Sequence, residues 1–174
     1  MHRRLLLVLA LPALGLIAQP AAAEVDFAAL RTSVRTAHLE PGYAALSGAA
    51  RQLKTAIDQH CKGGPESAEP EAARQAFHTA LDAWQTVQHI RSGPIEDSDG
   101  HARLQFWPDK RGITERHLRQ FLASPANPDL DAAMPDMSVA IQGFPALERL
   151  LFGNAPLSRH PINGEQTDRC SIAR

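Results

Sequence analysis

Residues 71–91 read EAARQAFHTALDAWQTVQHIR, and no other stretch of the chain carries a longer helical periodicity. Apolar side chains recur at every third or fourth position, which is the spacing of one face of an α-helix. The members of this face are Ala73, Phe77, Leu81, Trp84, Val87 and Arg91. All but the last are apolar, so the face should pack on a core. Arg91 is expected either to extend out of that core or to point into a site at the end of the bundle.

Further helices are predicted on both sides of this stretch. The first is expected over 26–39 with Asp26 as its cap, and the second begins near Tyr43, because Pro41-Gly42 should interrupt the helix. The second helix has the apolar face Leu46, Ala50, Leu53, Ile57 and Cys61. Later helices are expected at residues 114–123, 129–142 (irregular at Met134-Pro135) and 145–152. No strand pattern is convincing, so the sequence predicts an all-α fold, an up-and-down helical bundle.

A long connection, residues 93–112, shows no helical period. Connections of this length in a compact domain are usually functional or disordered. Within it, residues 103–112 read RLQFWPDKRG, and Pro108 excludes a continuous helix. Two aromatic residues should anchor this loop on the core, and three charged residues should face water or a ligand. They are Phe106 and Trp107, and Asp109, Lys110 and Arg111. The loop is either a structural plug with a solvated rim or one side of a binding cleft.

The first 23 residues have the pattern of a secretory signal peptide. Arg3 and Arg4 give a positive start, the apolar run 5–18 follows, and residues 21–23 are alanines of the kind that a signal peptidase recognises. A membrane anchor is the alternative, but the apolar run is short for a spanning helix. We therefore expect cleavage after Ala23, an exported domain over 24–174 and no transmembrane anchor once cleavage has occurred.

Charge and cysteine content limit the classes of partner. The chain has 18 basic and 19 acidic residues, and cleavage would remove two arginines and no acidic residue. The mature domain would be slightly acidic, so no nucleic-acid partner is expected. Export would place Cys61 and Cys170 in an oxidising compartment, where they form a disulfide if they lie close together. Their spacing does not show whether they do, so a disulfide and two separate thiols both remain open.

The histidines show no metal-binding pattern in the sequence. Bundles often bind metals through a histidine and an acidic residue three positions apart, and none of the eight histidines has such a neighbour. His78 and Asp82 are four positions apart and are interpreted as an exposed hydrogen-bonded pair. His89 is interpreted as favouring the dipole at a helix end. Five more histidines of the mature chain also lack a ligand spacing: His38, His60, His101, His117 and His160. Glu148 either faces solvent, pairs with an arginine, or turns into the bundle as a ligand or acid–base group.

Four motifs follow one another along the chain. They are Pro41-Gly42-Tyr43, Ala83-Trp84-x-x-Val87-Gln88-His89-Ile90-Arg91-x-Gly93-Pro94, FWPDKRG at 106–112 and GFPALERLLFG at 143–153, with Arg169-Cys170 after them. Together they resemble the imelysin-like family of exported bacterial proteins over most of the mature chain. The resemblance implies a periplasmic, all-helical protein built from two bundle-like halves. It also implies a role in iron or haem acquisition and in the cell envelope, and some members were described as metallopeptidases.

Two features depart from the pattern of the family. The family signature is Gly-x-His-x-x-Glu, and the matching positions here run from Gly143 to Glu148 with Pro145 in place of the histidine. Proline cannot coordinate a metal, so Glu148 is the one ligand of the signature that remains. Family members also continue beyond the position that matches Arg174. The chain therefore resembles an N-terminal half, whose apolar surfaces toward the other half should be exposed.

These observations together predict a non-catalytic, imelysin-like envelope protein with a ligand- or partner-binding role linked to iron or metal uptake. The candidate ligand-binding residues are Arg91, Trp107, Asp109, Arg111 and Glu148, with Glu148 also as a metal ligand. Arg111 and Glu148 are expected to lie close together beside Trp107. The expected cofactor is iron or another divalent metal, and the expected partner is an envelope protein or the missing C-terminal half. The alternatives are an imelysin-type metallopeptidase and a truncated paralogue without independent activity.

Overall fold

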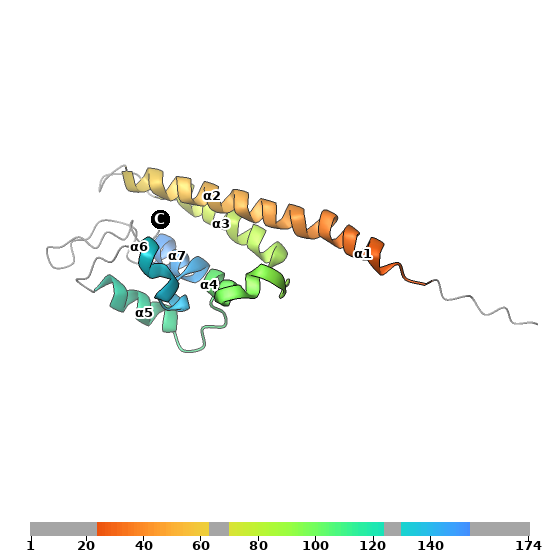
Figure 1. Cartoon of the computed structure of the whole chain (residues 1–174). Coiled ribbons are helices and arrows are strands. Elements are labelled where there is room, and N and C mark those ends of the chain that lie inside the picture. The colour runs from red at the N-terminus through yellow and green to blue at the C-terminus, as the bar shows by residue number, and fades with distance from the viewer. Residues whose placement is uncertain (1–23, 63–69, 124–129, 154–174) are drawn as a thin grey trace, which may run out of the picture.

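The computed structural model describes residues 24–62, 70–123 and 130–153, and within these ranges every regular element is a helix (Figure 1). The predicted all-α fold is therefore confirmed. One long helix, α2 (Glu40–Lys62), packs along α3 (Glu71–Val87). The shorter helices α4 (Gly100–Leu104), α5 (Ile113–Leu122) and α7 (Gly143–Phe152) form a second layer, in which α7 contacts α3, α4 and α5.

The N-terminal helix is not interrupted where the sequence predicts a break. It runs from α1 (Phe27–Val34) through a π-helical segment, Arg35–Leu39, directly into α2. In the π-helical segment the N–H of Glu40 donates to the carbonyl of Arg35, five residues earlier. This wider turn lies just before Pro41, which has no N–H to donate, and it lets the helix continue past the proline ring. A Cβ on Gly42 would lie 2.6 Å from Cγ1 of Val87, so glycine permits close packing of α2 on α3.

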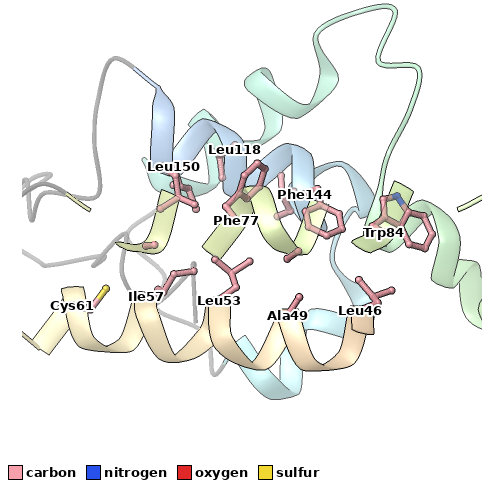
Figure 2. Packing of buried hydrophobic residues seen from close by; sticks show 14 of the residues in the cluster. Leu46, Ala49, Leu53, Ile57, Cys61, Phe77, Trp84, Leu118, Phe144 and Leu150 are labelled. Carbon is pink, nitrogen blue, oxygen red and sulfur yellow. The ribbon is translucent and has the colours of Figure 1, made fainter. Parts of the chain in front are cut away.

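The core lies between α2, α3 and α7 (Figure 2). The α2 side chains stand in a row on one face, toward Phe77, Phe144 and Leu150. The buried residues of the two long helices are Leu46, Ala49, Leu53, Ile57 and Cys61 in α2, and Ala73, Phe77, Ala80, Trp84 and Val87 in α3. The predicted faces are correct except at two positions. Ala49 is buried where Ala50 was expected, and Ala80 is buried more deeply than Leu81.

The connection after α3 contains short helices that the sequence did not predict. A 3-10 segment, η2 (Gly93–Asp99), leads into α4, with a kink at Ser98 and Asp99, where φ is 52° and 59°. Neither helix is long enough to produce a visible apolar periodicity. No helix spans Pro108, as expected from its sequence. The aromatic residue that anchors this connection is Trp84, which is fully buried and donates from Nε1 to Oε1 of Gln105 over 2.6 Å.

Trp107 lies outside the core, so its predicted role as a structural plug is wrong. Its side chain is 78% exposed, whereas the neighbouring Phe106 is half-buried. The aromatic pair was expected to act as one anchor, but only Phe106 approaches the interior. The loop 105–112 therefore presents a large aromatic surface to solvent.

Between α5 and α7 the predicted helix 129–142 is broken into pieces; residue 129 itself lies outside the described residues. The pieces are α6 (Leu130–Ala133), η3 (Met134–Asp136) and η4 (Val139–Ile141). The expected irregularity at Met134-Pro135 is present. The side-chain amide of Gln142 donates to the carbonyls of Met134 and Met137 over 3.0 and 2.9 Å, so those carbonyls are satisfied without a continuous helix.

α1 extends beyond the rest of the molecule in Figure 1 and leaves its apolar face uncovered. Phe27, Leu30 and Val34 are 70%, 51% and 44% exposed. Such a row on a helix is normally buried against a partner surface. None of the described helices is long and apolar enough to cross a membrane. The predicted signal peptide, residues 1–23, lies outside the described residues.

Candidate functional site

The start of α7 carries the Gly-x-x-x-x-Glu motif and is fixed by a close approach to α4. Gly143 has φ of 66°, a left-handed conformation that favours glycine. A Cβ at this position would collide with the carbonyl oxygens of Arg103 and Leu104. Glycine is therefore required for both conformation and space. As a result α7 begins at Gly143, two residues earlier than predicted.

Arg103 and Gln142 tie the same region together. Arg103 donates to the carbonyls of Ser98 and Pro135 over 2.7 and 2.8 Å, and to Oε1 of Gln142 over 3.2 Å. Gln142 is 8% exposed and uses its amide nitrogen for two further carbonyls. This network joins η2 and α4 to the segment before α7. Sequence reasoning missed both residues as scaffold elements, because their partners lie more than 30 residues away or on irregular backbone.

An apolar groove lies beside the motif, between α2, α4 and α7. Its volume is about 170 Å³, and its lining residues are Ala50, Leu53, Lys54, Ile57, Ala80, Leu104, Gly143, Phe144 and Leu147. The one charged side chain among them, Lys54, is paired with Asp58 at 2.9 Å. The groove therefore suits an apolar group rather than a metal ion.

Glu148 lies on the exposed side of α7. It forms no hydrogen bond or ion pair with the described residues, whereas the adjacent Arg149 lies 3.6 Å from Glu115. The side chain of Pro145 has no atom that could coordinate a metal ion. Across the part of the chain that the structure describes, no three side chains of the metal-binding types are grouped to hold an ion. The residues of the motif thus do not fit a metal site by themselves.

The other predicted site residues are dispersed around loop ends. Arg91 and Arg111 are exposed, and Trp107 is the most exposed large apolar side chain of the loop. Within the described ranges no hydrogen bond or ion pair joins Arg111 to Glu148. None of these residues lines the apolar groove. Their role in ligand binding, and the proximity of Arg111 to Glu148, remain predictions.

Asp109 has a definite structural partner. Its carboxylate accepts hydrogen bonds from the backbone N–H groups of Ile113 and Thr114 over 2.7 and 2.9 Å. The N-cap residue of α5, Gly112, has no side chain, so Asp109 caps the helix from three residues earlier. The hydrogen bond from Ile113, followed by that from Thr114, lowers the pKa of Asp109. Both oxygens are thus engaged with the helix start.

A second hollow lies where the π-helical segment meets the end of α3. This pocket, of about 670 Å³, is lined by Leu39, Glu40, Tyr43, Ile90, Ser92, Gly93, Pro94 and Ile95. Two of the family-like motifs, at Tyr43 and at Gly93-Pro94, meet here. Next to it, Nε2 of His38 lies 3.2 Å from Nε2 of His89. Sequence reasoning missed this pair because the two residues are 51 positions apart.

Cys61, at the end of α2, is buried and is not a free thiol. Cys170 lies outside the described residues. The pairing of Cys61 with Cys170, one of the two alternatives that the sequence left open, is therefore not tested by the described residues.

Comparison with known proteins decides the family. A family model described as Imelysin matches residues 39–173, which is most of the chain. The chain belongs to the imelysin family. The sequence motifs that suggested this family, from Pro41 to Gly153 with Arg169-Cys170 after them, all fall within the matched range. Pro145, which stands in the motif where the resemblance led us to expect histidine, is therefore a feature of a chain that belongs to this family.

The chain is also similar to two individual proteins. It is 30% identical over 112 residues to iron-regulated protein A of Synechococcus elongatus, covering 64% of this chain and 28% of that protein. It also resembles the crystal structure of an imelysin-like protein from Psychrobacter arcticum 273-4, with a TM-score of 0.67 and 23% identity. That match covers 83% of this chain and 42% of the other. The chain thus spans less than half the length of each of these two proteins.

Proposed function

We propose that this imelysin-family chain is an exported, periplasmic envelope protein that binds a ligand or partner connected with iron or metal uptake and is not a peptidase. The observation that carries the proposal is the state of the motif on α7. Pro145 stands where the family has histidine, and Glu148 is exposed without a second ligand among the described residues. The similarity to a protein named as iron-regulated supports the link to iron.

The metallopeptidase alternative needs more than this motif offers. Metal-dependent hydrolysis requires an ion held by several protein ligands, with an open position for an activated water. One solvated carboxylate cannot hold an ion in that way. The described part of α7 supplies a rigid, glycine-fixed start and an apolar groove beside it, which are features of a binding surface.

The exposed face of α1 supports a protein partner in addition to the ligand. Phe27, Leu30 and Val34 would be covered by an apolar surface, either from another envelope protein or from the C-terminal half of an imelysin-like chain. A truncated paralogue without independent activity would also leave this face uncovered. That alternative differs from the proposal because it forbids specific ligand binding by the chain alone.

A proteolysis assay tests the choice between binding and cleavage. The purified chain is incubated with an unstructured protein substrate and zinc, with and without a chelator. We expect no metal-dependent release of peptides. Zinc-dependent cleavage that Glu148→Gln abolishes, and that Glu71→Gln leaves unchanged, would overturn the proposal. Glu71 is the matched control because its carboxylate is also exposed on a helix surface.

A further inference from the structure

Two histidines from distant parts of the chain meet at the joint between the two long helices. His38 belongs to the π-helical segment Arg35–Leu39, and His89 follows the end of α3. Their Nε2 atoms are 3.2 Å apart and their ring centroids are 5.2 Å apart. His38 is half-buried and His89 is exposed, so solvent ions can reach the pair. The imidazole nitrogens thus face each other at an accessible position.

The spacing of the two nitrogens matches that of two ligands on one metal ion. At a metal–nitrogen distance of about 2.0–2.1 Å, a tetrahedral angle places two ligand nitrogens about 3.3 Å apart, and a right angle places them about 2.9 Å apart. The observed 3.2 Å lies between these values. Binding would therefore need little movement of either helix. The same distance also fits a hydrogen bond between two neutral rings, in which one Nε2 donates and the other accepts.

The local backbone explains how His38 comes to face His89. π-Helical turns insert one residue into a helix, rotate the side chains that follow, and occur frequently at functional sites. Here the inserted turn precedes Pro41 and brings His38 to the end of α3. Leu39 and Ile90, the residues directly after the two histidines, line the 670 Å³ pocket. A ligand in that pocket, or water, would therefore lie near the open coordination positions.

We propose that His38 and His89 form a binding site for a divalent transition-metal ion, separate from the motif on α7. Neutral imidazole is the ligand type that suits copper, nickel and zinc, and affinity should be highest for Cu²⁺. No third side chain of a metal-binding type joins the pair within the described ranges. The ion is thus held at two positions and leaves others open. This site goes beyond the proposed function and uses none of its residues.

Titration with Cu²⁺, Ni²⁺ and Zn²⁺ tests the site in the full-length chain, by calorimetry and by the electron paramagnetic resonance spectrum of bound Cu²⁺. We expect one Cu²⁺ with two coordinated imidazole nitrogens. His38→Ala and His89→Ala should each weaken binding at least about tenfold and leave a signal from one nitrogen at most. His78→Ala is the matched control, because it removes an exposed histidine of α3 that is not part of the pair, and it should change affinity less than about twofold.

Two results would overturn the site. One is a wild-type chain that binds none of the three ions, which would leave the pair as a hydrogen bond between rings. The other is binding that both pair variants retain unchanged. His89 is exposed and lies beyond the end of α3, so His89→Ala keeps the test valid even where His38→Ala disturbs the π-helical segment. Circular dichroism of each variant establishes that it is folded.

Discussion

Replacing Gly143 by alanine should destabilise the protein by about 2–5 kcal/mol. The left-handed backbone at this position, with φ of 66°, costs a residue with a Cβ about 1–2 kcal/mol. The new methyl group would also collide with the carbonyl oxygens of Arg103 and Leu104. These are backbone atoms of α4, so relief requires the two helices to separate. Overpacking of this kind lowers the free energy of unfolding by a further amount of about 1–3 kcal/mol.

Gly112→Ala is the matched control for this prediction. Gly112 also has a left-handed φ, 59°, but a Cβ there would meet no atom within 4 Å. It should therefore cost only the conformational term, about 1–2 kcal/mol. Urea denaturation of both variants, followed by circular dichroism, gives the difference in free energy of unfolding. Equal destabilisation of the two variants would refute the close approach of α7 to α4.

Three further predictions concern the loop, its cap and the exposed face. Trp107→Phe should leave only the fluorescence of the buried Trp84, which should be blue-shifted and poorly quenched by acrylamide. Trp84→Phe should leave the red-shifted, easily quenched fluorescence of Trp107 and lower the free energy of unfolding by about 1–3 kcal/mol, because Gln105 loses its hydrogen-bond donor. Similar emission from both variants would contradict the exposure of Trp107. Asp109→Ala should lower the free energy of unfolding at neutral pH, and the difference from wild type should vanish on acidification. The pKa of Asp109 is lowered in the folded state, so its stabilisation is present above the unfolded pKa of about 4 and is lost as the pH falls through the folded pKa; a difference independent of pH would contradict the cap. Leu30→Glu should leave the thermal stability of the chain unchanged, because this side chain is 51% exposed. It should reduce self-association or partner binding, measured by analytical ultracentrifugation. A large loss of stability would show that the apolar face of α1 packs within the chain.

The helical faces could be predicted from the sequence because their periodicity is local. Phe77, Trp84 and Val87 repeat at helical spacing, and the structure buries all three. The deviations arise where a distant group competes with local preference. Gln142 satisfies the carbonyls of Met134 and Met137, which a continuous helix would otherwise have used. No local sequence pattern predicts such a contact.

The candidate sites were harder to predict for the same reason. The helical spacing predicts that Trp84 is buried, but not that its Nε1 donates to Gln105, which lies 21 residues away. Asp109 looked like a ligand residue, but the side chain is used to begin α5. His38 and His89 had no ligand spacing, because their meeting depends on the π-helical segment and on the packing of α2 against α3. Charged residues in a loop thus show where a site can lie but not what each one contacts.

The most direct test of the proposed function is a calorimetric titration of the purified chain with iron and, separately, with haem. We predict saturable binding of one of the two ligands by the wild-type chain. His89→Ala is included so that binding at the histidine pair is recognised as a separate event. The absence of saturable binding of both ligands would contradict the proposed role in iron or metal uptake.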